Sequence, residues 1–247
     1  MIKLERLDAP AFLTSEEEER LADAYASSGA SVWGHAEIVE RLSASSHGKC
    51  AYCEAKLGRE SHYLEVDHFQ HKDKYSRLVA KWSNLLPSCR RCNGTKRSHD
   101  VVTKPIINPF NDEPKAHFSM KLYRYRHKTS LGLTSIDVLD LNNSARAVYA
   151  RYEIGEALHE KLIQCHERLA NYKETQTTRR RNLLLSLVRA VLSECQPSAS
   201  YSATAATILH RDESYLSLVS ELIELELWDD DLEILHQHSK SLSLEDS

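Results

Sequence analysis

The segment "CRRCNGTK" (89–96) carries a CxxC pair, and a second pair lies upstream in "CAYC" (50–53). Each pair can present two thiolates from one tight turn, and two such turns together make a closed, tetrahedral zinc site. The predicted ligands of this structural Zn²⁺ are Cys50, Cys53, Cys89 and Cys92. One alternative is four reduced thiols packed in the core. A redox role is disfavoured because no β-α-β pattern surrounds either pair.

Composition indicates a soluble chain of one or two domains, since its 247 residues are 41% hydrophobic and 28% charged. The net charge of −4 is unevenly spread. Residues 71–104 contain nine Lys or Arg and two Asp, whereas residues 205–247 contain two Lys or Arg and eleven Asp or Glu. The basic segment could bind a polyanion such as a nucleic acid, whereas the acidic segment would repel one.

Three kinds of segment are missing from the sequence, and their absence reduces the number of possible functions. No apolar run approaches the roughly 20 residues that span a bilayer, and residues 1–12 lack an apolar signal core, so we expect no membrane partner and a cytoplasmic location. No GxxxxGK[ST] motif is present. Any ATP hydrolysis is therefore expected from another chain.

Residue patterns predict an α+β fold that is predominantly helical. Helices are expected over 13–28, with Thr14 or Ser15 as the N-cap, and over 31–46. Single strands are expected over 63–69 and 118–128. Beyond these, apolar stripes predict helices from Asn142 onward, with Cys165 and Cys195 as core residues and a fraying acidic tail. The expected segments are an N-terminal helical segment (1–48), a zinc-stabilised finger (49–118), a connecting strand or loop (119–141) and a C-terminal helical, partner-docking region (142–247).

The insert between the cysteine pairs reads "VDHF" (66–69) and "WSNLLPSC" (82–89), followed by "CRRCNGTK". This series resembles the four-cysteine subtype of the HNH endonuclease family, whose ββα-metal finger surrounds one catalytic divalent ion. The resemblance implies that His68 is the catalytic base, that Asn84 positions it, and that Asp67 and Asn93 bind the ion. The resemblance also matches Lys96 to a lysine of the family. Charge alone predicts a platform for backbone phosphates that consists of Lys96, Arg90, Arg91 and Arg97. The final position holds Asn where many members hold His.

The same residues suit phosphodiester hydrolysis on chemical grounds. His68, with an ordinary pKa near ~6.5, can take a proton from water at neutral pH. Asp67 and Asn93 offer the hard oxygen donors that Mg²⁺ or Mn²⁺ prefers. Because alternate strand residues face opposite sides, Asp67 and His68 can share one centre only if the strand ends or bends there. His62 and His71 are interpreted as surface residues, and His99 and His117 stay open as additional site residues.

A wider resemblance extends to "IINPFNDEPKAHF" (106–118) and "GLTSIDVLDLNN" (132–143). Together with the finger, these segments are similar to the HNH subunit of Septu anti-phage systems, including retron-associated Septu. Gln70-His71 stands where that family commonly has a basic residue and proline. The resemblance implies a nuclease that acts with a separate ABC-like ATPase, and in retron systems with a reverse transcriptase and its RNA–DNA product.

The predicted function is therefore a metal-dependent endonuclease that cleaves or nicks DNA. The alternatives are a zinc-stabilised nucleic-acid-binding module and a non-catalytic adaptor of the same complex. The sequence leaves open the choice of DNA or RNA, strandedness, sequence specificity, the activating trigger and the stoichiometry with the ATPase.

Overall fold

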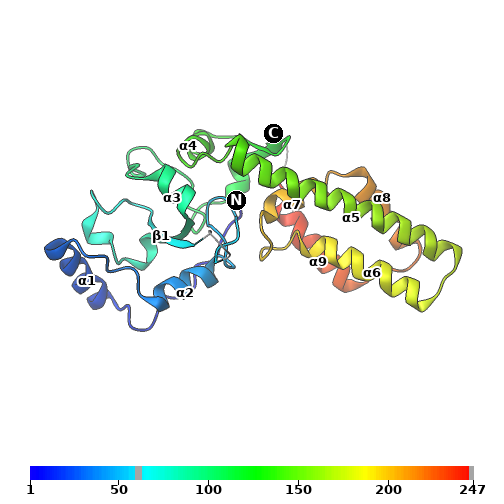
Figure 1. Cartoon of the computed structure of the whole chain (residues 1–247), viewed down its shortest axis with the longest axis horizontal. Coiled ribbons are helices and arrows are strands. Elements are labelled where there is room, and N and C mark those ends of the chain that lie inside the picture. The colour runs from blue at the N-terminus through cyan, green and yellow to red at the C-terminus, as the bar shows by residue number, and fades with distance from the viewer. Residues whose placement is uncertain (59–62, 245–247) are drawn as a thin grey trace. The chain divides into compact units, whose positions relative to one another are not determined.

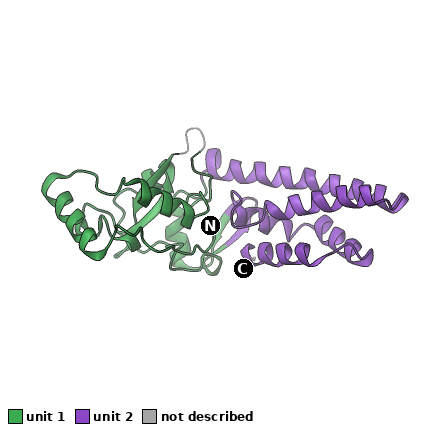
Figure 2. Cartoon of the chain, turned by 90° about the horizontal axis from the view of Figure 1, so that it is seen from below, with its two compact units in different colours: residues 1–118, 125–142 green, residues 119–124, 143–247 purple. Residues whose placement is uncertain are grey.

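The chain forms two compact units in a computed structural model that describes residues 1–58 and 63–244. One unit comprises 1–118 and 125–142, and the other comprises 119–124 and 143–247 (Figure 2). The described part is predominantly helical with two small sheets, which confirms the predicted class (Figure 1). None of its helices is long and apolar enough to cross a membrane. His62 lies outside the described residues.

Two helices open the first unit, α1 (Ser15–Ser28) and α2 (Ala36–Ser45). The Thr14 hydroxyl accepts the Glu17 N–H at 3.2 Å, which confirms Thr14 as the N-cap. Val32, expected on the second helix, precedes α2. The apolar core under these helices consists of Leu13, Ile38, Leu42, Trp82 and Leu85. The two helices are therefore packed on the segment that leads into the second strand.

The cysteine-bracketed region forms two strands and a helix. Strand β1 (Leu64–His68) pairs antiparallel with β2 (Leu85–Cys89), with Leu64 opposite Cys89 and His68 opposite Leu85. Helix α3 (Arg90–Lys96) begins directly after β2. The connection between the strands contains two 3₁₀ turns, η1 (Ser76–Leu78) and η2 (Trp82–Asn84). This order is the predicted ββα finger, and β1 ends at His68.

The segment 118–128, predicted as one strand, is a hairpin. Strands β3 (Phe118–Lys121) and β4 (Arg124–His127) are joined by Leu122 and Tyr123, whose φ values are 48° and 62°. Two successive left-handed residues make a tight turn usually marked by Asn-Gly or Asp-Gly, and that signal is missing here. The turn η3 (Pro114–Ala116) precedes the hairpin and α4 (Ser130–Val138) follows it.

The second unit is helical. Its elements are the π-helical turn η4 (Ser144–Val148), α5 (Tyr149–Glu174), α6 (Thr178–Ser193), α7 (Ser202–Leu209), α8 (Glu213–Glu224) and α9 (Asp230–Leu242). The short link 175–177 sets α5 and α6 side by side (Figure 1). The prediction of a fraying tail is wrong as far as Leu244, because Asp229 caps α9 and both Leu232 and Leu244 are buried.

The core of this unit contains the predicted stripes of α5, α6 and α8. On α5 the buried face includes Gly155 and Leu158. Two residues of the predicted apolar stripes are instead exposed, Tyr152 on α5 at 44% and Ile223 on α8 at 54%. Cys165 and Cys195 are fully buried core residues, as predicted. Burial raises the pKa of these thiols to about 11 and about 12.

Candidate active site and zinc centre

The four predicted cysteines converge in the finger. Their Sγ atoms all lie within 4.8 Å of one another and all four residues are buried. Cys53 Sγ lies 3.8 Å from Cys89 Sγ, which matches the roughly 3.8 Å between ligands of a tetrahedral site with Zn–S bonds of about 2.3 Å. Donor type and spacing fit structural zinc. Within residues 1–58 and 63–244, no other His, Cys, Asp and Glu cluster of this kind forms, and neither Asp67 nor His68 belongs to the four-cysteine group.

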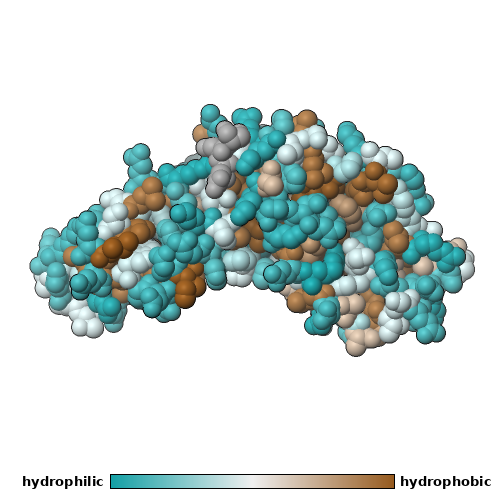
Figure 3. Space-filling view, turned by 180° about the vertical axis from the view of Figure 1, so that it is seen from behind, coloured by the Kyte–Doolittle hydropathy of each residue, from teal (hydrophilic) through white to brown (hydrophobic). Residues whose placement is uncertain are grey.

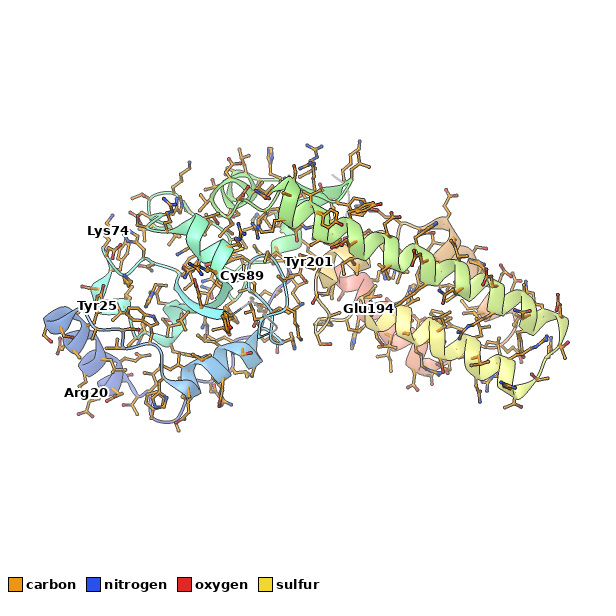
Figure 4. All side chains as sticks on the ribbon, viewed as in Figure 1. Arg20, Tyr25, Lys74, Cys89, Glu194 and Tyr201 are labelled. Atoms are coloured by element: carbon orange, nitrogen blue, oxygen red, sulfur yellow. The ribbon has the colours of Figure 1, made fainter. Side chains whose placement is uncertain are left out.

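Backbone contacts hold the two cysteine turns on the sheet. Ala51 N–H donates to the Pro87 carbonyl at 2.9 Å, which docks the first turn on β2. Cys89 ends β2 and caps α3, where its Sγ accepts the Cys92 N–H at 3.5 Å (Figure 4). Hydrogen bonds from neighbouring thiols lower the pKa of Cys89, whereas burial raises the pKa of Cys50. Zinc binding would therefore join the start of α3 to the first turn.

A pocket of about 390 Å³ lies at the end of β1. Its lining includes Trp33, Asp67, His68, His71, Asn93 and Arg97. Asp67 and His68 are consecutive on a strand, yet both line this pocket because His68 is the last residue of β1. The structure thus brings together the predicted base and both predicted ligands of the catalytic ion.

His68 is held in one orientation and one tautomer. Its Nε2 lies 3.0 Å from the Val79 carbonyl oxygen, which can only accept a hydrogen bond, so Nε2 carries the proton. Nδ1 therefore keeps a free lone pair. The indole of Trp33 meets the imidazole edge-on, with ring centroids 4.5 Å apart. Burial lowers the pKa of His68, which keeps the ring neutral at neutral pH and available as a base.

Asn84 holds two backbone segments near His68, the one that follows β1 and the one that contains Val79. Its Nδ2 donates to the carbonyls of Gln70 at 3.0 Å and Leu78 at 3.1 Å, and its Oδ1 accepts the Gln70 N–H at 2.8 Å. Gln70 lies two residues after His68, and Leu78 directly precedes Val79, the acceptor of His68. One buried amide thus links the end of β1 to the loop that orients the imidazole.

The N-terminal helical segment supports the turn that carries Asn84. Glu18 of α1 accepts the Trp82 N–H at 2.9 Å and the Lys81 ammonium at 2.8 Å. The Arg6 guanidinium donates to the Trp82 and Leu85 carbonyls, both at 2.9 Å. Burial lowers the pKa of Arg6 to about 10, still well above neutral pH. These bonds restrain η2 from outside the finger.

Asp67 is almost fully buried and both of its oxygens are engaged. Oδ2 accepts the Tyr52 hydroxyl at 2.6 Å, and Oδ1 accepts the Lys96 ammonium at 3.0 Å. Burial, together with the charge of Asp67, raises the pKa of Tyr52 well above its ordinary value, so the phenol stays a donor. Lys96 also donates to the His68 carbonyl at 2.6 Å. Tyr52 belongs to the first cysteine turn, and Lys96 is the last residue of α3, the helix that begins at the second.

Lys96 corrects one expectation. The basic cluster predicts that Lys96 contacts backbone phosphate, but Lys96 is only 2% exposed and forms a buried ion pair with Asp67. It lies four residues after Cys92, so both project from the inward face of α3. Arg90, Arg91 and Arg97 are exposed, and Arg97 lines the pocket.

Asn93 lies at the pocket with its amide oriented by Glu65. Asn93 Nδ2 donates to Glu65 Oε2 at 2.8 Å, which leaves Oδ1 as an oxygen donor. Glu65 and Asp67 alternate on β1 and therefore share the face turned to α3. The carboxylate of Asp67 and the amide oxygen of Asn93 have the donor chemistry that fits Mg²⁺ or Mn²⁺.

His99 and His117, which the sequence left open as site residues, lie outside the pocket, whereas His71 lines it. His99 Nε2 lies 2.7 Å from the Lys104 carbonyl, and His117 Nδ1 lies 2.8 Å from the Thr129 hydroxyl, and neither lines the pocket. His71, interpreted as a surface residue, does line it, and its Nδ1 is buried without a hydrogen-bond partner among the described residues. Sequence reasoning also missed Trp33 and Tyr52. The position of Tyr52 between two zinc ligands was the available signal.

Comparison with known proteins agrees with this geometry. Residues 50–99 match the model of the HNH endonuclease family, so the ββα finger and its pocket define the chain as an HNH nuclease. The Septu protein PtuB of Bacillus thuringiensis is 40% identical over 246 residues, covering 98% of this chain and 93% of that protein. The chain therefore belongs to the Septu PtuB family. The Septu protein PtuB of Bacillus mycoides (strain KBAB4) is 27% identical over 163 residues, covering 51% of this chain and 54% of that protein. No solved structure matches the chain significantly.

Proposed function

We propose that this protein hydrolyses DNA phosphodiester bonds with a catalytic Mg²⁺ or Mn²⁺, as the nuclease of an anti-phage defence complex. The observation that carries the proposal is the position of His68, whose Nε2 lies 3.0 Å from the Val79 carbonyl oxygen, in the same pocket as Asp67 and Asn93. A zinc-stabilised module that only gripped nucleic acid would not need a base held in one tautomer beside two oxygen donors.

Each residue has a defined task in this mechanism. The cation, when bound, neutralises phosphate charge and stabilises the leaving oxygen. Asp67 and Asn93 would hold the cation. His68 Nδ1 removes a proton from the attacking water, and the Val79 carbonyl keeps Nε2 protonated through the hydrogen bond it accepts. Arg90, Arg91 and Arg97, all exposed, bind flanking phosphates.

The test is nicking of supercoiled plasmid by the full chain with Mg²⁺ or Mn²⁺, alone and with its candidate ATPase partner. We expect His68→Ala to abolish nicking while DNA binding persists. The matched control is His127→Ala, since His127 is exposed on β4 and does not line the pocket. Binding without cleavage by the unmodified chain under all these conditions would favour the binding module or the non-catalytic adaptor.

We further propose that the second unit docks on a separate ABC-like ATPase. Family membership supports a partner, and the absence of a P-loop motif in the sequence fits an ATPase on another chain. Apolar residues are exposed on α5, among them Tyr149, Tyr152 and Ile163. The hydropathy surface shows apolar patches among hydrophilic ones (Figure 3). Exposed tyrosines are residues that protein interfaces favour.

Co-purification of the full chain with the ATPase encoded beside it tests the docking. We expect Tyr149→Ala with Tyr152→Ala to weaken recovery of the ATPase, whereas Tyr63→Ala, which removes a 73% exposed tyrosine of the first unit, leaves it unchanged. Equal recovery with all variants would contradict docking through α5. A neighbouring reading frame for a reverse transcriptase would add that enzyme and its RNA–DNA product as partners.

A further inference from the structure

Tyr52 connects the zinc centre to the pocket. It stands between Cys50 and Cys53 in the first cysteine turn and is completely buried. Its hydroxyl donates to Asp67 Oδ2 at 2.6 Å, a short, charge-assisted hydrogen bond. Phenylalanine would fill the same space, so only the hydroxyl is needed for this contact.

The carboxylate of Asp67 is fixed from both zinc-binding turns. Tyr52 holds Oδ2 from the first turn, and Lys96 holds Oδ1 from the helix that begins at the second turn. A carboxylate with both oxygens engaged cannot rotate freely, and each oxygen keeps a second lone pair. Hydrogen bonds of this kind orient metal ligands and commonly change metal affinity.

We propose that Tyr52 is a positioning residue that orients Asp67 for the catalytic divalent cation. The affinity of the site for that cation would then depend on the first cysteine turn, which carries Tyr52 and two of the zinc ligands. The inference rests on the proposed function, because it takes Asp67 as a ligand of the catalytic ion. It adds a residue that does not itself contact the ion or the scissile phosphate.

The experiment measures Mn²⁺ binding, by electron paramagnetic resonance of free Mn²⁺, to the full chain in a His68→Ala background. Zinc content is measured on the same samples. The variant is Tyr52→Phe. The matched control is Tyr75→Phe, because Tyr75 also donates to an aspartate, Asp100, at 2.8 Å in the same unit, but does not line the pocket. Asp67→Asn establishes that the measured ion binds at Asp67.

We expect Tyr52→Phe to retain equimolar zinc and to weaken Mn²⁺ binding about 10–100-fold, with Tyr75→Phe unchanged. In the active chain, excess Mn²⁺ should restore cleavage by Tyr52→Phe. Unchanged Mn²⁺ affinity would overturn the inference, as would Mn²⁺ binding that survives Asp67→Asn. Loss of zinc from Tyr52→Phe would also overturn it, since Tyr52 would then be a structural part of the turn. Failure of the unmodified chain to cleave DNA, with the affinity shift intact, would count against the proposed function alone.

Discussion

Replacing Lys96 by methionine tests the charge balance of the pocket. Lys96 Nζ lies 3.0 Å from Asp67 Oδ1, and the two side chains are 0% and 3% exposed. Methionine keeps most of the aliphatic length but removes the countercharge. Removing one partner of a buried ion pair typically costs about 3–5 kcal/mol, because the other charge stays buried and uncompensated. We expect Lys96→Met to lower the free energy of unfolding of the first unit by that amount when no Mg²⁺ or Mn²⁺ is added.

The destabilisation should depend on the divalent cation. A cation bound at Asp67 supplies the missing positive charge, so Mn²⁺ should stabilise Lys96→Met more than the unmodified chain. Any ligand that binds only the folded state at 100 times its Kd adds about 2.7 kcal/mol. The difference in the free energy of unfolding between Lys96→Met and the unmodified chain should therefore decrease as the Mn²⁺ concentration is raised.

Urea unfolding followed by tryptophan fluorescence measures both effects, since Trp33 and Trp82 belong to the first unit. The control is Lys74→Met, which removes an ion pair with Asp100 in which Lys74 is 52% exposed. An exposed pair contributes about 0–1 kcal/mol, so this variant should unfold close to the unmodified chain. If Lys96→Met unfolds as Lys74→Met does, with no added response to Mn²⁺, Lys96 does not neutralise Asp67.

Three further predictions concern positioning, phosphate binding and pH. Asn84→Asp keeps the hydrogen bond accepted from the Gln70 N–H but removes the two that the Asn84 amide donates. The rate of single-turnover nicking should fall about 10²-fold, with DNA binding retained. An unchanged rate would exclude a positioning role for Asn84. Replacing Arg90, Arg91 and Arg97 with alanine should reduce the slope of log K against log salt for duplex DNA by roughly 0.9 for each phosphate that the variant no longer neutralises, and an unaltered slope would show that other residues bind the phosphates. Burial lowers the pKa of His210 to about 4, so its contribution to the stability of the second unit is complete above about pH 6.5 and is lost as the pH falls toward 4. After allowance for solvent screening we expect a decrease of about 1–2 kcal/mol, and urea unfolding of His210→Gln across this range should show a flatter pH dependence.

The finger could be predicted from the sequence because its signals are local and chemically restrictive. Two CxxC turns leave few arrangements besides one tetrahedral site, and their separation requires an insert. The geometric condition under which Asp67 and His68 could share a centre is met, because β1 ends at His68 and both residues line one pocket. Helix starts were also readable, since Thr14 caps α1 through a side-chain bond spanning three residues.

The secondary-structure predictions were wrong where contacts between distant parts of the chain determine the local structure. Leu122 and Tyr123 carry no turn signal, and only their left-handed backbone makes the hairpin. The tail from Asp229 looked acidic and polar, yet buried Leu232 and a capping carboxylate suffice to hold α9 on the core. Composition describes a segment's average, whereas a helix needs only one apolar face.

Lys96 shows the same distinction within the site. The sequence places Lys96 close to Arg90, Arg91 and Arg97, and this cluster predicts a basic surface. Helical periodicity separates it from them, because Lys96 lies four residues after the zinc ligand Cys92 and must share its inward face. The metal ligands thus identify which lysine is internal. Lys96 supplies the countercharge for the buried carboxylate of Asp67, and the Tyr52 hydroxyl donates a hydrogen bond to the other oxygen of the same group. Under the proposed function, a divalent cation at Asp67 would bind the oxygen lone pairs that Tyr52 and Lys96 do not use.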